Sequence, residues 1–177
     1  MLIGISGSLR AGSTNTMLVE EAGRAWGGPF KLADIRFPLF DADLQDSKGI
    51  PAEVQALADA IGAAEAVVIS TPEYNQSLSG VLKNALDWIS RVAEKPWEDK
   101  PVAIMSAAAG RSGGARGNYA LRLAVTPFRP RLLTREVMLA DARNQFDAEG
   151  RLASDRYRVQ VDELMAALRR EVARGAV

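Results

Sequence analysis

The residues best suited to chemistry lie in a polar loop that follows the first apolar run of the chain. This loop spans residues 7–15 and reads GSLRAGSTN. Gly7 and Gly12 allow the backbone to turn sharply and to approach a ligand closely. The helix predicted to start at Asn15 directs its free N–H groups and its positive dipole end at the loop. Hydroxyl, amide and guanidinium donors complete an anion site, from Ser8, Arg10, Ser13, Thr14 and Asn15.

The kind of anion follows from what this loop lacks. A nucleoside triphosphate site of the GxxxxGK[ST] type needs a lysine where this chain has Ser13. The dinucleotide pattern GxGxxG is absent as well. A loop rich in hydroxyl groups and free of lysine suits a phosphate monoester such as that of FMN. Thr14 or Asn15 alone would equally well be a helix N-cap; the whole cluster favours anion binding.

A second polar loop, residues 71–75 (TPEYN), follows the clearest strand of the sequence. Pro72 fixes the direction in which the chain leaves that strand. Tyr74 offers a flat apolar face, and Asn75 can hydrogen-bond the edge of a heteroaromatic ring. Glu73 is either a general base or a structural carboxylate, and the absence of a second acid or a histidine nearby favours the structural role.

A third loop, residues 107–114, consists of small residues that permit close approach of a planar ring. Arg111 and Arg116 flank this loop. They are candidates either for contacts with the phosphates of a dinucleotide or for ordinary surface charges.

Composition excludes most protein-based catalysis. The chain contains no cysteine and no histidine, which removes thiolate nucleophiles, disulfides, imidazole bases and the usual zinc and haem ligands. Any chemistry must come from carboxylates, hydroxyls, backbone groups or a cofactor, and we expect no metal site. The 22 basic residues balance the 22 acidic ones, so nucleic acid is not an expected partner.

Alternating strands and helices must position these loops. Strands are predicted near residues 2–6, 30–35, 66–71, 101–106 and 132–139, and helices over residues 15–25, 54–61, 79–92, 118–125 and 154–174. Residues 38–43 read as an irregular loop that reaches toward Pro51. This alternation predicts an α/β protein: a flavodoxin-like three-layer fold with a five-stranded parallel sheet in the order 2-1-3-4-5. Ligands of such sheets bind at the carboxyl ends of the strands, where the three polar loops gather.

No linker, repeat or low-complexity segment interrupts the sequence, so we expect one domain over residues 1–177. No segment approaches the roughly 20 apolar residues that a membrane span requires. The first residues lack the pattern of a secretory signal. We therefore expect a cytoplasmic protein without membrane contact.

The loops together resemble the NAD(P)H-dependent FMN reductases, a flavodoxin-like family that includes chromate and quinone reductases. The matching motifs are GSLRAGSTN (7–15), PLFDADLQ (38–45), TPEYNQSLSGVLKNALDWISR (71–91) and GGARGNYALR (113–122), and the similarity covers essentially the whole chain. The resemblance implies that residues of the first loop hold the FMN phosphate and ribityl chain: Ser8, Leu9, Arg10, Ser13, Thr14 and Asn15.

The same resemblance assigns the isoalloxazine ring of FMN to the second loop, at Pro72, Glu73, Tyr74, Asn75 and Gln76. The family often has a serine where this chain has three alanines, so the backbone N–H of Ala108 would contact the ring instead. Family members are usually dimers or tetramers that associate through the helix containing SGVLKNALDW. Leu86 and Trp88 are thus expected at an interface between subunits.

The functional hypothesis is an oxidoreductase in which NADPH or NADH reduces bound FMN by hydride transfer. The reduced flavin then passes electrons to a small-molecule acceptor: a quinone, free flavin, an azo compound or a metal oxyanion such as chromate. No side chain needs to act as a catalytic group, because the flavin carries the chemistry. Two alternatives remain: a flavodoxin-type carrier of single electrons, disfavoured by the neutral charge, and a binding or regulatory domain without flavin.

Overall fold

A five-stranded parallel sheet in the order β2-β1-β3-β4-β5 forms the centre of the computed structural model, which describes residues 1–175. This confirms the predicted fold class and strand order. The strands are β1 (Leu2–Ser6), β2 (Phe30–Ala33), β3 (Ala66–Thr71), β4 (Pro101–Ala107) and β5 (Arg131–Leu139). The helices are α1 (Thr14–Trp26), α2 (Ala42–Lys48), α3 (Ala52–Ala63), α4 (Gly80–Ile89), α5 (Ala115–Val125) and α6 (Asp155–Arg174), with short 3-10 turns at Thr126–Phe128 and Ala142–Asn144.

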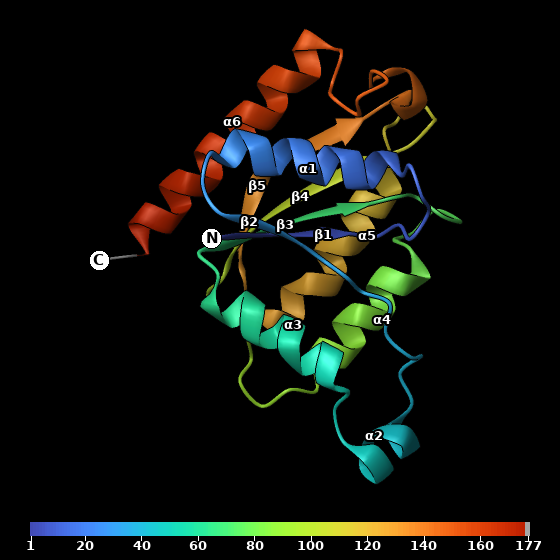
Figure 1. Ribbon diagram of the computed structural model, residues 1–177, viewed down its shortest axis with the longest axis vertical. Helices are drawn as coiled ribbons and strands as arrows, with labels where there is room; N and C mark the ends of the chain where they lie inside the picture. The colour runs from blue at the N-terminus through green and yellow to red at the C-terminus, as the bar shows by residue number, and fades with distance from the viewer. Residues whose placement is uncertain (176–177) are drawn as a thin grey trace.

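Helices cover both faces of the sheet (Figure 1). Helices α1 and α6 pack on one face, and α3, α4 and α5 pack on the other. The central strands β1, β3 and β4 are buried along their whole length, which is why they read as unbroken apolar runs. Successive side chains alternate between the two layers: Val67 and Ile69 of β3 enter one core, whereas Ala66 and Val68 enter the other.

Gly4 of β1 lets helix α1 lie close to the sheet. A Cβ atom at this position would lie 2.4 Å from Cγ1 of Val19 and 2.6 Å from the Phe30 ring. Neither neighbour is the free end of a flexible chain, so a larger residue would push α1 outward. The position of α1 matters because its N-terminus forms one wall of the candidate site.

Helix α2 corrects the sequence analysis, which predicted an irregular loop over residues 38–43. The Asp41 side chain caps this helix by accepting a hydrogen bond from the Asp43 N–H (2.9 Å). Helix α2 has no buried residue, so it lacks the apolar periodicity by which helices are recognised in a sequence. In Figure 1 it projects from the body of the molecule below α4.

Across residues 1–175, none of the helices is both long enough and apolar enough to cross a membrane.

Candidate active site

The three predicted loops and the connection after β5 meet in a cavity of about 320 Å³ at the carboxyl edge of the sheet. The cavity is lined by nine of the twelve predicted cofactor residues: Ser8, Arg10, Ser13, Thr14, Asn15, Pro72, Glu73, Tyr74 and Ala108. Its lining does not include the other three predicted residues, Leu9, Asn75 and Gln76. Ala107, Ala109, Ala142 and Arg143 complete the wall. The volume lies in the range of roughly 300–1,000 Å³ that is usual for ligand sites.

The N-terminus of α1 opens into this cavity as an anion cradle. Ser13 is the N-cap, and its Oγ accepts a hydrogen bond from the Thr16 N–H (3.3 Å). Gly12 adopts a left-handed φ of 66° that turns the chain into the helix. The first backbone N–H groups of a helix have no acceptor within it, so those of Thr14 and Asn15 are available to a phosphate. The exposed Arg10 adds a positive charge, and this donor set fits a phosphate monoester.

The side chain of Asn15 is engaged within the protein. It is only 3% exposed, and its Oδ1 accepts hydrogen bonds from the Ser70 hydroxyl (2.7 Å) and the Ala107 N–H (3.1 Å). Its Nδ2 donates to the Ala107 carbonyl (3.0 Å). These bonds tie the start of α1 to the ends of β3 and β4. The amide group of Asn15 therefore already has protein partners, whereas its backbone N–H, in the first turn of α1, has no acceptor within the helix.

Glu73 joins the second loop to helix α5. Its Oε2 accepts a hydrogen bond from the backbone N–H of Arg116 (3.0 Å), and its Oε1 lies 3.6 Å from the Arg116 guanidinium. Helix α5 has Gly114 as its N-cap and no side-chain cap of its own, so Glu73 supplies the missing acceptor. The structural role favoured for Glu73 is the one observed. Arg116 is thereby directed at Glu73.

The tip of the second loop is a tight hairpin. Tyr74 and Ser77 exchange two backbone hydrogen bonds of 3.0 Å, and Asn75 and Gln76 between them both have positive φ (49° and 65°). Positive φ at both central residues is the mark of a type I′ turn. The turn holds Tyr74 at the rim of the cavity with 54% of its surface exposed, which leaves its ring free to contact a ligand.

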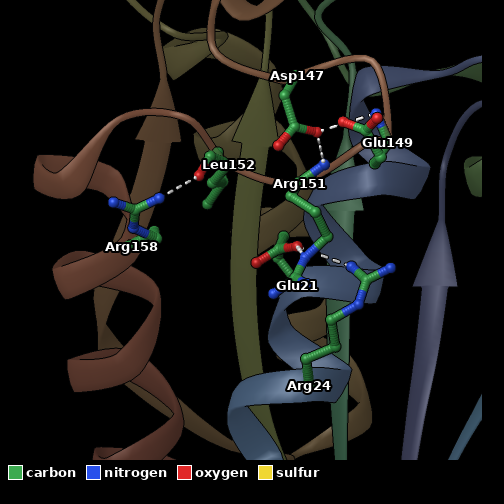
Figure 2. A network of polar contacts seen from close by, with 7 residues as sticks. All are labelled: Glu21, Arg24, Asp147, Glu149, Arg151, Leu152 and Arg158. Atoms are coloured by element: carbon green, nitrogen blue, oxygen red, sulfur yellow. Dashed lines mark hydrogen bonds and ion pairs between the residues drawn. The ribbon is translucent and has the colours of Figure 1, made fainter.

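The connection from β5 to α6 supplies two wall residues that the sequence analysis missed, Ala142 and Arg143. Figure 2 shows how this connection is fastened to α1: the nearly buried carboxylate of Glu21 accepts hydrogen bonds from Arg24 (2.8 Å) and Arg151 (2.5 Å). The bond to Glu21 raises the pKa of Arg151 above its usual value. The Asp147 carboxylate closes the turn over residues 147–151 by accepting a hydrogen bond from the backbone N–H of Arg151 (2.7 Å). The carboxyl end of β5 lies at the same edge of the sheet as the other loops. The residues that follow β5, Arg143 among them, could therefore have been included in the predicted site.

A neighbouring hollow of about 520 Å³ lies on the β2 side of the first loop. Ser8, Arg10 and Ser13 line both spaces, and Leu9 lines only the larger one. The larger hollow is formed by the first loop, α1 and the end of β2, away from the loops after β3 and β4. We place the flavin in the smaller cavity because only there do the anion cradle and the two ring-side loops face one another.

The expectation that Leu86 and Trp88 lie at a subunit interface is wrong. Both are buried within the chain itself (2% and 0% exposed), on the face of α4 that packs into the core. The indole N–H of Trp88 donates to the Pro38 carbonyl (2.8 Å) and so holds the segment before α2.

Comparison with known proteins shows which family the whole chain is similar to. Residues 1–144 match the family model described as NADPH-dependent FMN reductase. The chain is 44% identical over 171 residues to an NAD(P)H-dependent FMN reductase of Pseudomonas aeruginosa, covering 94% of this chain and 92% of that protein. It is 46% identical over 127 residues to a quinone reductase of Escherichia coli, covering 68% of this chain and 66% of that protein.

Among solved structures, the flavoenzyme NAD(P)H:(acceptor) oxidoreductase FerB of Paracoccus denitrificans is similar, with a TM-score of 0.87, 26% identity, and coverage of 98% of this chain and 97% of that one. Fold, site and similarity together define a flavodoxin-like oxidoreductase that uses FMN with NADPH or NADH. The chain belongs to the NADPH-dependent FMN reductase family.

Replacing Asn15 tests its role as a structural tie. We expect Asn15→Ala to lower the free energy of unfolding by about 3 kcal/mol, because the Ser70 hydroxyl and both backbone groups of Ala107 lose their buried partner. Urea unfolding measures the change, and Thr14→Ala at the adjacent helix position is the control. Loss of FMN binding with unchanged stability would instead make the Asn15 amide a direct ligand.

Gly117 offers a second test, because α5 touches the second loop there. A Cβ atom at Gly117 would lie 2.9 Å from the Pro72 carbonyl oxygen and 3.1 Å from the Glu73 Cα, so backbone must move. We expect Gly117→Ala to weaken FMN binding by about tenfold, measured by fluorescence titration. Gly80→Ala is the matched control, since a Cβ atom at this helical position meets nothing within 4 Å. Equal affinities for both variants would show that the position of the second loop does not govern binding.

Proposed function

We propose that this enzyme reduces quinones to hydroquinones with NADPH or NADH, two electrons at a time, at FMN held in the 320 Å³ cavity. The observation that carries the proposal is the meeting of the α1 cradle with the loops after β3 and β4 in one cavity. The naming of an Escherichia coli relative as a quinone reductase supports quinones over the other acceptors considered. The balanced reaction converts a quinone, NAD(P)H and a proton to a hydroquinone and NAD(P)⁺.

Each wall of the cavity has a task in this reaction. The backbone N–H groups of Thr14 and Asn15, with Arg10, hold the FMN phosphate. Small side chains at Ala107–Ala109 leave room for the flat ring of the cofactor. The ring contact predicted for the Ala108 N–H is corrected by the structure, because this N–H already donates to the Leu139 carbonyl (3.1 Å). Tyr74 at the rim offers an apolar face on which a quinone or a nicotinamide can be oriented.

Arg143 extends the positive charge of the site. It is exposed and lines the cavity together with Arg10. Arg10 and the N-terminus of α1 already serve the FMN phosphate in this proposal, so we assign Arg143 to the phosphates of the nicotinamide donor.

The chain's own groups do little proton chemistry. The carboxylate of Glu73 is engaged by Arg116, and the sequence has no histidine or cysteine. Bound FMN supplies the acceptor and donor chemistry for two electrons. We therefore expect solvent to provide the proton that completes the hydroquinone.

A carrier of single electrons is the alternative function on this fold. Such a protein docks on partners through a strong charge, whereas this chain balances 22 basic with 22 acidic residues.

Free flavin, azo compounds and chromate are the other acceptors of the hypothesis. The exposure of Tyr74 at the rim leaves the ring side of the cavity open to them as well.

Steady-state kinetics with NADPH and 1,4-benzoquinone test the proposal. We expect parallel double-reciprocal lines, because both substrates use the same ring face in turn, and no reduction of added cytochrome c beyond that caused by hydroquinone. Reduction of cytochrome c by a one-electron product, or no turnover of quinone, would contradict the proposal.

Arg10 offers a separate test of the phosphate site. Arg10→Gln should raise the Kd for FMN by about tenfold through loss of a charged phosphate contact. Arg170→Gln, at an exposed position on α6, should leave the Kd unchanged.

A further inference from the structure

The connection from β5 to α6, residues 140–154, lies largely at the surface, yet it supplies Ala142 and Arg143 to the wall of the 320 Å³ cavity. Within this connection only Ala142 and Leu152 are buried. Apolar packing therefore fixes little of its backbone, because segments with few buried apolar contacts are the ones that open most easily. The position of Arg143 must depend instead on the polar contacts of the connection.

A 3-10 turn of residues 142–144 presents Arg143. The residue before this turn, Asp141, has a positive φ of 49°, a conformation that residues other than glycine keep only where surrounding contacts enforce it. The Ala142 N–H donates to the Ala108 carbonyl (3.1 Å), in the loop after β4. The start of the connection is thus fixed to the side of the cavity where we place the flavin ring.

A short hairpin continues from this turn and returns to Arg151. The Asp147 N–H donates to the Arg151 carbonyl and the Ala153 N–H donates to the Gln145 carbonyl, both at 2.9 Å. The Gln145 N–H in turn donates to the carbonyl of the first residue of the 3-10 turn (3.3 Å). Backbone hydrogen bonds therefore link Arg151 to the turn that carries Arg143, and contiguous contacts of this kind can pass on a displacement.

Glu21 holds the far end of the connection against α1 (Figure 2). Its carboxylate is 8% exposed, and its Oε1 accepts hydrogen bonds from Arg151 (2.5 Å) and Arg24 (2.8 Å). A nearly buried carboxylate needs a charged partner, and Arg24 in the same helix already provides one. The bond to Arg151 spans 130 positions of the chain, and it fixes the connection relative to the helix whose N-terminus lines the cavity.

We propose that the Glu21–Arg151 ion pair positions Arg143 for the phosphates of NADPH or NADH, so that Arg151 sets the affinity for the donor without touching it. This role rests on the proposed function, which assigns Arg143 to those phosphates. Arg143 is exposed and has no ion-pair partner within residues 1–175. Its placement therefore comes from its backbone, and a fixed backbone lowers the ordering cost when a ligand binds.

Calorimetric titration of NADP⁺ into the FMN-loaded protein tests this role. NADP⁺ carries the phosphates of NADPH but no transferable hydride, so its binding is measured without turnover. We expect Arg143→Gln to raise the Kd of NADP⁺ about tenfold through loss of a charged phosphate contact. Arg151→Gln should raise the Kd about fivefold, because Arg143 is then less well placed. The Kd of FMN should stay unchanged in both variants.

Arg24→Gln is the matched control. Arg24 and Arg151 donate to the same oxygen of Glu21, and their side chains are 42% and 52% exposed. Arg24 belongs to α1 and does not hold the connection, so its replacement should leave the Kd of NADP⁺ unchanged. Wild-type affinity in Arg151→Gln, or an equal loss of affinity in Arg24→Gln, overturns the proposal.

A double variant separates positioning from a general loss of stability. If Arg151 acts through Arg143, Arg151→Gln adds nothing to the Kd of NADP⁺ once Arg143→Gln is present. A merely structural role of Arg151 would change the Kd by the same factor in both backgrounds, which contradicts the proposal. Unchanged affinity in Arg143→Gln would also overturn it and leave quinone reduction intact. Conversely, failure of quinone turnover would leave these affinities measurable, because no acceptor takes part.

Discussion

The paired hydrogen bonds between the Asn15 side chain and the backbone of Ala107 are the contact on which the active site depends. They join positions 92 residues apart, and a third bond from the Ser70 hydroxyl brings β3 into the same cluster. The start of α1, where we propose that the phosphate binds, is thereby held at a fixed distance from the loops that we propose receive the flavin ring. A cofactor with a phosphate at one end and a ring at the other requires that separation to be constant.

The other polar side chains near the site act in the same manner. The Ser79 hydroxyl donates to the Gly7 carbonyl (2.5 Å), the Ser106 hydroxyl donates to the Gly113 carbonyl (2.7 Å), and Glu73 accepts the Arg116 N–H (3.0 Å). Each contact fixes one loop against a neighbouring element. Side chains hold the loops, and the first backbone N–H groups of α1 remain for the cofactor. This division explains how a chain without histidine or cysteine can serve as an oxidoreductase.

The sequence was sufficient for the fold because β1, β3 and β4 are buried on both faces and therefore read as continuous apolar runs. The sequence was insufficient for elements and contacts that leave no periodic pattern of apolar residues. Helix α2 buries nothing, so only the Asp41 cap marks it. The structural role of Asn15 depends on a partner far away in the chain, and Arg143 comes from a loop whose composition does not distinguish it from surface. Helix α4 was correctly predicted, but the assignment of its Trp88 to an interface required knowledge of what α4 packs against.

Anaerobic titration of the FMN-loaded protein with NADPH, followed by visible absorbance, tests the central claim most directly. The account predicts that FMN binds with one flavin per chain and that its visible absorbance is lost on addition of an equivalent amount of NADPH or NADH, without any added reductase. A protein that fails to bind FMN, or that binds it and leaves it oxidised in the presence of both donors, would contradict the account.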